Sequence, residues 1–103
     1  NAPCGDATDA MLLTIVPAAT ADAGSDATIC EGESYSLNGS ATNYSTISWT
    51  GGDGTFDDNT SLWATYTPGP NDILAGSVTL TLTALGNAPC GDATDAMLLT
   101  IVP

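Results

Sequence analysis

The chain has 103 residues, of which twelve are acidic and none is Lys, Arg or His, so its formal net charge is −12. Without basic side chains it cannot neutralise phosphates or anionic lipid, which excludes nucleic-acid binding and polybasic attachment to membranes. The lack of His and Lys also excludes an ordinary Ser–His–Asp triad, an imidazole metal site and a Schiff base. Only carboxylates remain for acid–base chemistry, so we expect that the protein is not an enzyme. No apolar run reaches the ~18 residues of a membrane-spanning helix, so we expect no direct membrane insertion.

The first seventeen residues, NAPCGDATDAMLLTIVP, occur again without change as residues 87–103. The offset is 86 residues, and near-perfect repetition at a fixed period is the signature of a tandem array. We interpret residues 18–103 as one complete repeat and residues 1–17 as the C-terminal loop and strand of the preceding repeat. The partners predicted by this organisation are neighbouring identical repeats of the same chain or fibre.

The first half of the repeat predicts short strands separated by turns. Residues 18–30 are rich in Ala and Gly and predict an irregular segment along a sheet edge. After the EGE turn, apolar residues alternate with small polar ones in SYSLNGSA (34–41) and again in YSTISWT (44–50), which predicts two half-buried strands. GGDGTFDDNTS (51–61) predicts a loop anchored by Phe56.

The second half continues the same pattern. SLWATYT (61–67) predicts a strand, PGPND (68–72) ends it, and GSVTLTLTAL (76–85) is the most regular alternation in the chain. A loop at 87–95 then precedes a last strand at 96–102. Short strands at intervals of about ten residues predict an all-β fold, an antiparallel immunoglobulin-like β-sandwich. The inward-facing positions of these strands give the predicted core: Tyr35, Leu37, Ile47, Trp49, Val78, Leu80, Leu82, Met97, Leu99 and Ile101.

Each repeat contains two cysteines, Cys30 and Cys90, because Cys4 is the equivalent of Cys90 in the preceding repeat. An even number in a chain of extracellular character predicts a disulfide. In a sandwich of this type the two cysteines are expected at opposite poles, about 25 Å apart, whereas bridged Cα atoms lie within about 7 Å. Two pairings remain open: a bond within one repeat, which needs an unusual path for the first strand, and a bond from Cys30 to the Cys90 equivalent of the following repeat.

Two groups of carboxylates are candidate calcium sites, since Ca²⁺ takes six to eight oxygen ligands. One group is in the glycine-rich loop: Asp53, Asp57 and Asp58. The other surrounds the junction between repeats: Asp22, Asp26, Asp92 and Asp95. The alternative is a solvated acidic surface that keeps copies of the chain apart by repulsion. No cofactor is required by either interpretation.

Trp63 and Leu98 are apolar residues at positions that should face outward. One interpretation is a contact patch between repeats or between neighbouring chains of a fibre. The alternative is a local bulge, or the scattered surface hydrophobes that soluble proteins normally show.

ADAGSDATICEGESYSLNGSA (21–41) resembles the opening of the polycystic-kidney-disease (PKD) type of immunoglobulin-like repeat, and ISWTGGDGTF (47–56) resembles its tryptophan strand and GDG turn. With TYTPGPNDI, GSVTLTLTA and APCG, the whole period is similar to the PKD-like tandem repeats of large surface adhesins in gliding and related Bacteroidetes. The chain has WTGGDG where PKD domains usually have WDFGDG. The resemblance implies a β-sandwich, an extracellular cell-surface location, secretion by the type IX route of that phylum, and a role in cell adhesion or filament formation without catalytic residues.

Two functions follow from these observations. The first is a structural stalk repeat that gives a long adhesin or filament its reach and mechanical stability, since a spacer needs many identical copies. The second is a binding module in which each repeat presents a weak site for carbohydrate or a surface, strengthened by multivalency. Trp63 and the GGDGTFDDN loop are the candidates for such a site. With only six aromatic residues in the chain, we favour the stalk.

Overall fold

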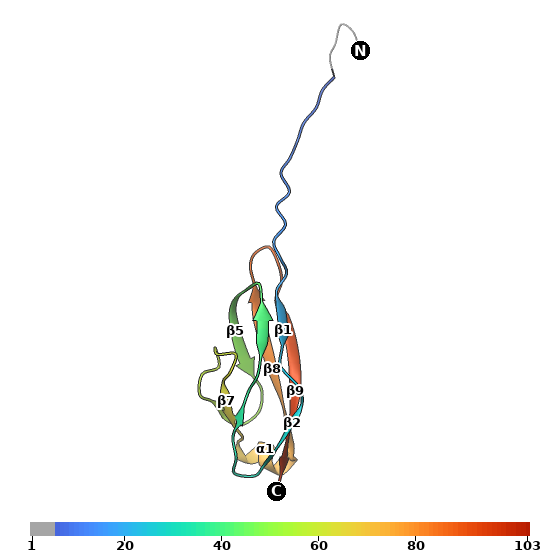
Figure 1. Ribbon diagram of the computed structural model, residues 1–103. Helices are drawn as coiled ribbons and strands as arrows, with labels where there is room; N and C mark the ends of the chain where they lie inside the picture. Colours follow the sequence, from blue (N-terminus) through green and yellow to red (C-terminus); the bar gives the residue numbers. More distant parts are fainter. Residues whose placement is uncertain (1–5) are drawn as a thin grey trace.

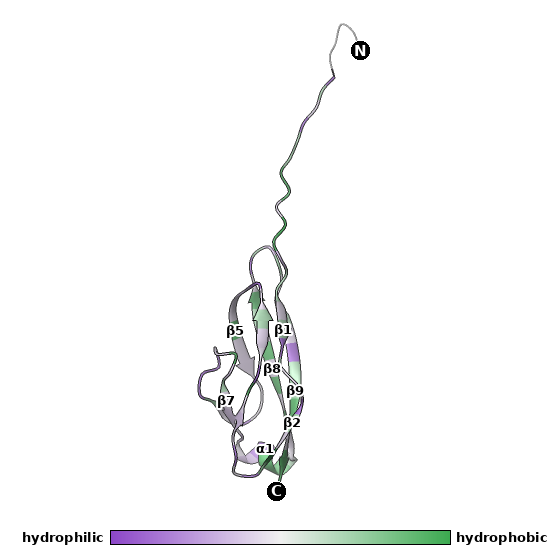
Figure 2. Ribbon diagram, in the orientation of Figure 1, coloured by the Kyte–Doolittle hydropathy of each residue, from purple (hydrophilic) through white to green (hydrophobic). Residues whose placement is uncertain are grey.

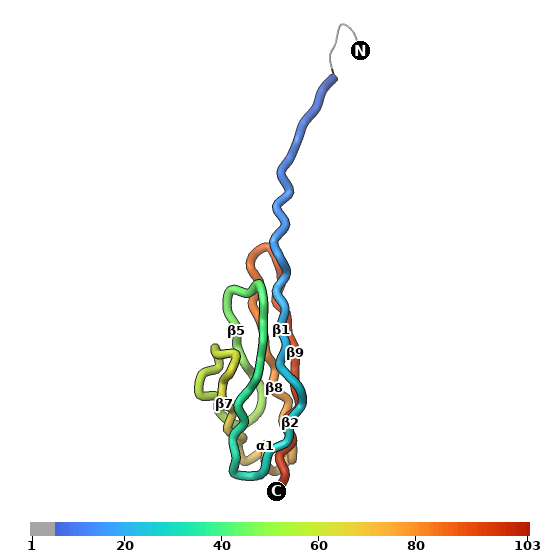
Figure 3. The backbone as a smooth tube through the Cα atoms, in the orientation of Figure 1, coloured from blue at the N-terminus to red at the C-terminus, as the bar shows by residue number. Residues whose placement is uncertain are grey.

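The computed structural model describes residues 6–103; Cys4 lies outside this range. Residues 6–19 run as an extended segment, and residues 20–102 fold into one elongated domain (Figures 1 and 3). The chain measures 86 × 20 × 18 Å along its principal axes. The extended segment joins one end of the domain, here called the N-terminal pole, and the chain leaves at the other, the C-terminal pole (Figure 1).

Within the described residues, the domain is built from strands and one short helix. In chain order these are β1 (Thr20–Asp22), β2 (Ala27–Cys30), β3 (Tyr35–Ser36), β4 (Ser40–Thr42), β5 (Tyr44–Thr50), β6 (Thr55–Phe56), β7 (Thr65–Thr67), α1 (Pro70–Ala75), β8 (Ser77–Gly86) and β9 (Ala93–Val102). The fold is therefore all-β and sandwich-like in character, as the alternating pattern predicts.

The largest sheet has four strands in the order β2-β9-β8-β5. Strands β8 and β9 are antiparallel over eight residue pairs, from Ser77 opposite Thr100 to Ala84 opposite Ala93. Strand β2 pairs with β9 in parallel, which differs from the purely antiparallel sheet expected from the sequence. The reason is the direction of the chain, because β2 and β9 both run from the N-terminal pole to the C-terminal pole (Figure 1).

The core lies between this sheet and a second layer formed by the pair β1-β4 and the three-stranded sheet β3-β7-β6. Nine of the ten predicted core residues are buried, and Tyr35 is half-buried against them. Tyr66, in the strand predicted at 61–67, is fully buried beside Phe56, with ring centroids 4.8 Å apart. In Figure 2 the apolar colour follows β8 and β9, and it continues along the extended segment outside the domain.

Six segments differ from the expected elements. The strand expected at 34–41 is divided into β3 and β4, which pair in different sheets, and the loop expected at 51–61 contains β6, which pairs with β7. Residues 18–30 contain two strands, because β1 finds a partner in β4 and β2 finds one in β9. The strand expected at 61–67 begins only at Thr65; before it, the chain turns so that the Ser61 carbonyl accepts the indole N–H of Trp49 at 2.9 Å. Pro70 opens a helix instead of a simple break, since proline suits the first helical position. Strand β9 begins at Ala93 rather than at residue 96 because β8 pairs with it as far as Ala84, which lies opposite Ala93.

Candidate functional site

The extended segment 7–16 has the same sequence as β9, ATDAMLLTIV, but none of the contacts of β9. In β9 the side chains of Leu99 and Ile101 are 0% and 2% exposed. Their equivalents Leu13 and Ile15 are 73% and 84% exposed. The segment is thus a copy of a core strand that lies outside the sheet, in line with the long axis of the domain (Figure 1).

Three side-chain contacts at the N-terminal pole hold the end of the extended segment and the first residue of β1. The thiol of Cys90 donates to the carbonyl oxygen of Val16 at 3.3 Å. The amide of Asn43 donates to the carbonyl of Ala18 at 3.4 Å, and the hydroxyls of Thr20 and Thr42 lie 2.5 Å apart. These contacts direct the segment into β1 along the axis of the domain.

Cys30 is the last residue of β2 and lies at the C-terminal pole, in register with Val102 of β9. The next amide, that of Glu31, donates to the Val102 carbonyl at 2.7 Å. The Glu33 carboxylate accepts the Cys30 amide at 2.8 Å and closes the turn. A hydrogen bond with Glu33, together with its negative charge, raises the pKa of the exposed Cys30 thiol.

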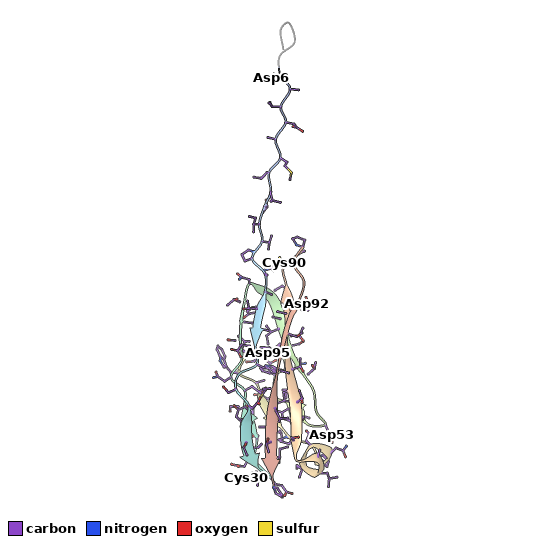
Figure 4. The ribbon with its side chains drawn as sticks, turned by 90° about the vertical axis from the view of Figure 1, so that its right-hand side faces the viewer. Asp6, Cys30, Asp53, Cys90, Asp92 and Asp95 are labelled. Carbon is purple, nitrogen blue, oxygen red and sulfur yellow. The ribbon has the colours of Figure 1, made fainter. Side chains whose placement is uncertain are left out.

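Cys30 and Cys90 lie at opposite poles of the domain (Figure 4). Cys30 is level with Val102, whereas Cys90 precedes Ala93 at the other end of β9. A ten-residue strand extends about 30 Å, and bridged Cα atoms lie within about 7 Å. A disulfide between the two cysteines of one repeat is therefore incompatible with this fold, and both are free thiols in the structure.

The glycine-rich loop is held by the buried carboxylate of Asp72, which the sequence analysis did not single out. Tyr66 donates its hydroxyl hydrogen to this carboxylate, and the amides of Asp53 and Gly69 donate to it at 3.0 and 3.1 Å. The hydroxyl of Tyr66 in turn accepts the Gly54 amide at 2.9 Å. The signal in the sequence is proline at the first position of α1 followed by Asp72 at the third, where a carboxylate accepts the amide of the preceding cap residue.

The same loop depends on close approach at Gly52, where φ is +74°. A Cβ atom there would lie 2.0 Å from the hydroxyl oxygen of Tyr66. Burial, together with the hydrogen bond to Asp72, raises the pKa of Tyr66 to about 12. Burial alone would raise the pKa of Asp72, but the hydrogen bonds from Tyr66 and the backbone amides outweigh it and lower that pKa. The network thus holds a charged carboxylate in the interior without a basic partner.

The carboxylates of the glycine-rich loop accept hydrogen bonds that hold the loop in place. Asp53 accepts the Asn71 amide at 3.2 Å, and Asp57 accepts the Thr65 amide at 2.7 Å. Asp58 accepts the amide and hydroxyl of Thr60 at 3.0 and 2.6 Å, which lowers its pKa. Within residues 6–103, no group of three acidic or cysteine side chains is arranged to hold a metal ion.

The junction carboxylates are also separated. Asp95 accepts the Ala23 amide at 2.8 Å, and Asp26 accepts the Leu98 amide at 2.8 Å. The remaining two accept amides in their own turns: Asp22 that of Gly24, and Asp92 that of Gly86. For a preceding repeat, the equivalents of Asp92 and Asp95 are residues 6 and 9. Figure 4 labels Asp6 near the start of the extended segment. A whole strand separates them from the junction, so the expected shared calcium site is not assembled there.

Trp63 is 68% exposed and lines a surface groove of about 430 Å³. The other apolar residues of the groove are Tyr44, Ile47 and Leu62. Leu98 lies on the outer face of β9 and is 41% exposed. The two predicted surface residues therefore lie on different elements, and only Trp63 belongs to a hollow.

Searches against protein-family models and curated proteins found no match. Between residues 6 and 103 no helix has the length and apolar character that a membrane span requires. The repeated sequence makes the two poles the candidate functional site. Residues 7–16, at the N-terminal pole, are identical to β9, which ends at the C-terminal pole.

Proposed function

We propose that the chain is a structural stalk repeat of a long extracellular adhesin or surface filament, which gives the parent protein reach and mechanical stability. In this proposal the domain is of the PKD-like, immunoglobulin-like type, its secretion follows the type IX route, and residues 1–17 belong to the preceding repeat. The partners are the neighbouring identical repeats.

The observation that carries the proposal is the position of the segment 7–16. It is an exposed copy of β9 that approaches the N-terminal pole along the long axis of the domain (Figure 3). If it is completed by its own sheet, a second domain lies end to end with the first. Only residues 17–19 separate the end of the copied strand from β1, and they begin with Pro17. A connection of three residues spans at most about 10 Å, which leaves little freedom between domains.

The two poles also suit serial connection. The chain enters at one end of the domain and leaves at the other, so an array of such domains grows along a line. The net charge of −12 with no basic residue favours extended, mutually repelling chains over lateral collapse. Both features are those of a spacer.

The test is small-angle X-ray scattering from chains of one, two and four repeats, made by repeating residues 18–103 after residue 103. We expect the maximum dimension to increase by a constant amount for each repeat, at least the ~30 Å of a ten-residue strand. The matched control carries a Gly-Ser insertion after Pro17 of each junction. A native array no longer than the inserted array would contradict the stalk proposal.

A second candidate is a multivalent binding module, because Trp63 and Tyr44 line an open groove. Aromatic side chains at the edge of a shallow groove suit the apolar faces of sugars. The test is a titration of the protein with soluble polysaccharides, followed by isothermal titration calorimetry. A signal that disappears in Trp63→Ala and persists in Leu98→Ala supports binding at the groove; no signal in the native chain overturns it.

A further inference from the structure

We propose that Cys30 of each repeat forms a disulfide with Cys90 of the following repeat, so that the array is covalently stapled at every junction. The inference rests on the array proposed above. It deepens that proposal by assigning the pair of atoms that join one domain to the next.

The first step is the equivalence of two valines. The period is 86 residues, so residues 1–17, which precede each repeat, are residues 87–103 of the repeat before it. Val16 and Val102 are therefore the same residue of the array. Contacts that the structure gives to Val102 at the C-terminal pole, and to Val16 at the N-terminal pole, are therefore contacts to one residue of the array. The single chain contains both halves of the junction.

The second step is that both cysteines are adjacent to this valine. Cys30 is the register partner of Val102, and the amide of Glu31 donates to the Val102 carbonyl at 2.7 Å. The thiol of Cys90 donates to the carbonyl of Val16 at 3.3 Å. In the array the two donors meet at one oxygen, and a carbonyl oxygen has two lone pairs to accept them.

The third step is direction and distance. The Val102 carbonyl points toward β2, since it accepts from Glu31, so a thiol that reaches the same oxygen lies on the Cys30 side of the strand. The Cα atom of Cys30 is about 2.4 Å from the Glu31 nitrogen, so in the array it lies at most about 8.4 Å from the Cys90 sulfur. Cys30 is exposed, and Cys90 is in the loop between β8 and β9. Rotation of Cys30 and a small shift of this loop bring the sulfurs into bonding range.

The reaction is a thiol–disulfide exchange. The thiolate of one cysteine attacks a small-molecule or protein disulfide and displaces one of its thiols, forming a mixed disulfide. The second cysteine, as its thiolate, then attacks the first sulfur and releases the other thiol. Two S–H bonds are lost and one S–S bond forms, while the oxidant is reduced to two thiols.

The disulfide limits how far the array can lengthen when its repeats unfold under tension. Without it, an unfolded repeat lengthens the chain by up to 86 residues, or about 300 Å. With it, the shortest covalent path crosses every second bond and follows only the 26 residues from Cys90 of one repeat to Cys30 of the next, which is about 90 Å for every two repeats. The maximum extension per repeat therefore falls to about a sixth.

The test uses a two-repeat chain, residues 1–103 followed by a second copy of residues 18–103, with Cys4→Ser. Because peptides from the two repeats are identical, the pairing is read from variants that keep only two cysteines. The predicted pair keeps Cys30 of the first repeat and Cys90 of the second. The matched control keeps Cys30 and Cys90 of the first repeat. Both are incubated at low concentration with oxidised glutathione and analysed by intact mass without reduction, after alkylation of free thiols.

We expect the predicted pair to form an intrachain disulfide and the control pair to remain as free or glutathione-bound thiols. The proposal is overturned if the predicted pair stays open, forms only dimers between chains, or closes no faster than the control. Near-ultraviolet circular dichroism of Trp49 verifies that every variant is folded. Scattering from the same samples separates the two proposals, because an extended array with open thiols contradicts the staple alone, whereas a collapsed or bent array contradicts the stalk.

Discussion

Residues 7–16 and residues 93–102 are identical in sequence and opposite in structure. Met97 is 2% exposed inside the sheet, whereas Met11, its counterpart, is 80% exposed in a segment without strand pairing. The difference cannot come from intrinsic propensity, which is the same for both. It comes from the neighbours β2 and β8, which only the second copy has. Strand formation here is a property of the partners as much as of the segment.

The largest effect expected from this comparison is in the core. Leu99→Ala removes a fully buried side chain and should lower the free energy of unfolding by about 2–5 kcal/mol. Leu13→Ala makes the same chemical change in the exposed copy and should alter it by less than about 0.5 kcal/mol. Urea unfolding followed by the fluorescence of Trp49 measures both. Equal losses in the two variants would show that residues 7–16 are packed in solution.

A second experiment asks whether stability depends on a site outside the repeated segment. Asp72→Asn replaces the buried carboxylate that accepts the amides of Asp53 and Gly69 by a neutral side chain, which weakens these hydrogen bonds. It should lower the free energy of unfolding by about 1–3 kcal/mol at neutral pH. The pKa of Asp72 is lowered in the folded state, so its contribution is present above the unfolded pKa of about 4 and is lost as pH falls through the folded value. Unfolding curves between pH 2 and 7 should therefore be flatter for Asp72→Asn than for the native chain. The matched control is Asp9→Asn, for which we expect the native pH dependence.

The same network predicts that the domain loses stability at alkaline pH, where Tyr66 ionises. The pKa of Tyr66 is raised to about 12, so its contribution to stability is complete below the unfolded pKa of about 10 and is lost as pH rises from there toward 12. Tyr66→Phe should remove this loss, as measured by unfolding at pH 9 and pH 11. A native chain whose stability does not change between these two values would contradict the assignment.

A smaller effect distinguishes Asp95 from Asp9, which are equivalent residues in the two copies. Asp95 accepts the Ala23 amide across the sandwich at 2.8 Å, whereas Asp9 accepts the amide of its own neighbour, Ala10. Asp95→Ala should lower the free energy of unfolding by about 1–2 kcal/mol, whereas Asp9→Ala should leave it almost unchanged. Thermal unfolding by circular dichroism detects the difference. If both substitutions are neutral, the contact of Asp95 with residue 23 does not contribute to stability.

The smallest effect concerns the thiol at the C-terminal pole. The Glu33 carboxylate raises the pKa of Cys30, so Glu33→Gln should move the midpoint of its alkylation by iodoacetamide to lower pH. Glutamine retains an oxygen that can accept the Cys30 amide, so the turn is preserved. Glu31→Gln is the control with the same loss of charge. A larger shift in this control would assign the effect to general charge rather than to the contact with Glu33.

Alternation of apolar and polar residues predicted the strands that carry the core. Val78, Leu80 and Leu82 repeat every second residue, and all three are buried. The short strands β1 and β2 escaped prediction because Ala and Thr carry little apolar contrast, and pairing with β4 and β9 decides their state.

The candidate site was predictable only in part. The offset of 86 residues made Cys4 and Cys90 equivalent, but sequence spacing alone left two disulfide pairings open. The register of Cys30 with Val102 places Cys30 at the opposite pole from Cys90, which argues against the pairing within one repeat. The sequence could not show this register, because the two strands are about seventy residues apart along the chain. The role of Asp72 depends likewise on Tyr66 and Asp53, which the fold brings together from different segments.

The parallel pairing of β2 with β9 has a mechanical consequence. If the two ends of the domain are pulled apart, β2 is drawn toward the N-terminal pole and β9 toward the C-terminal pole. Two parallel neighbours pulled from opposite ends are loaded in shear, so the hydrogen bonds between them share the force instead of opening one after another. Rupture of a repeat then requires the whole ladder to fail together, and resistance to pulling becomes a property of strand direction rather than of thermodynamic stability.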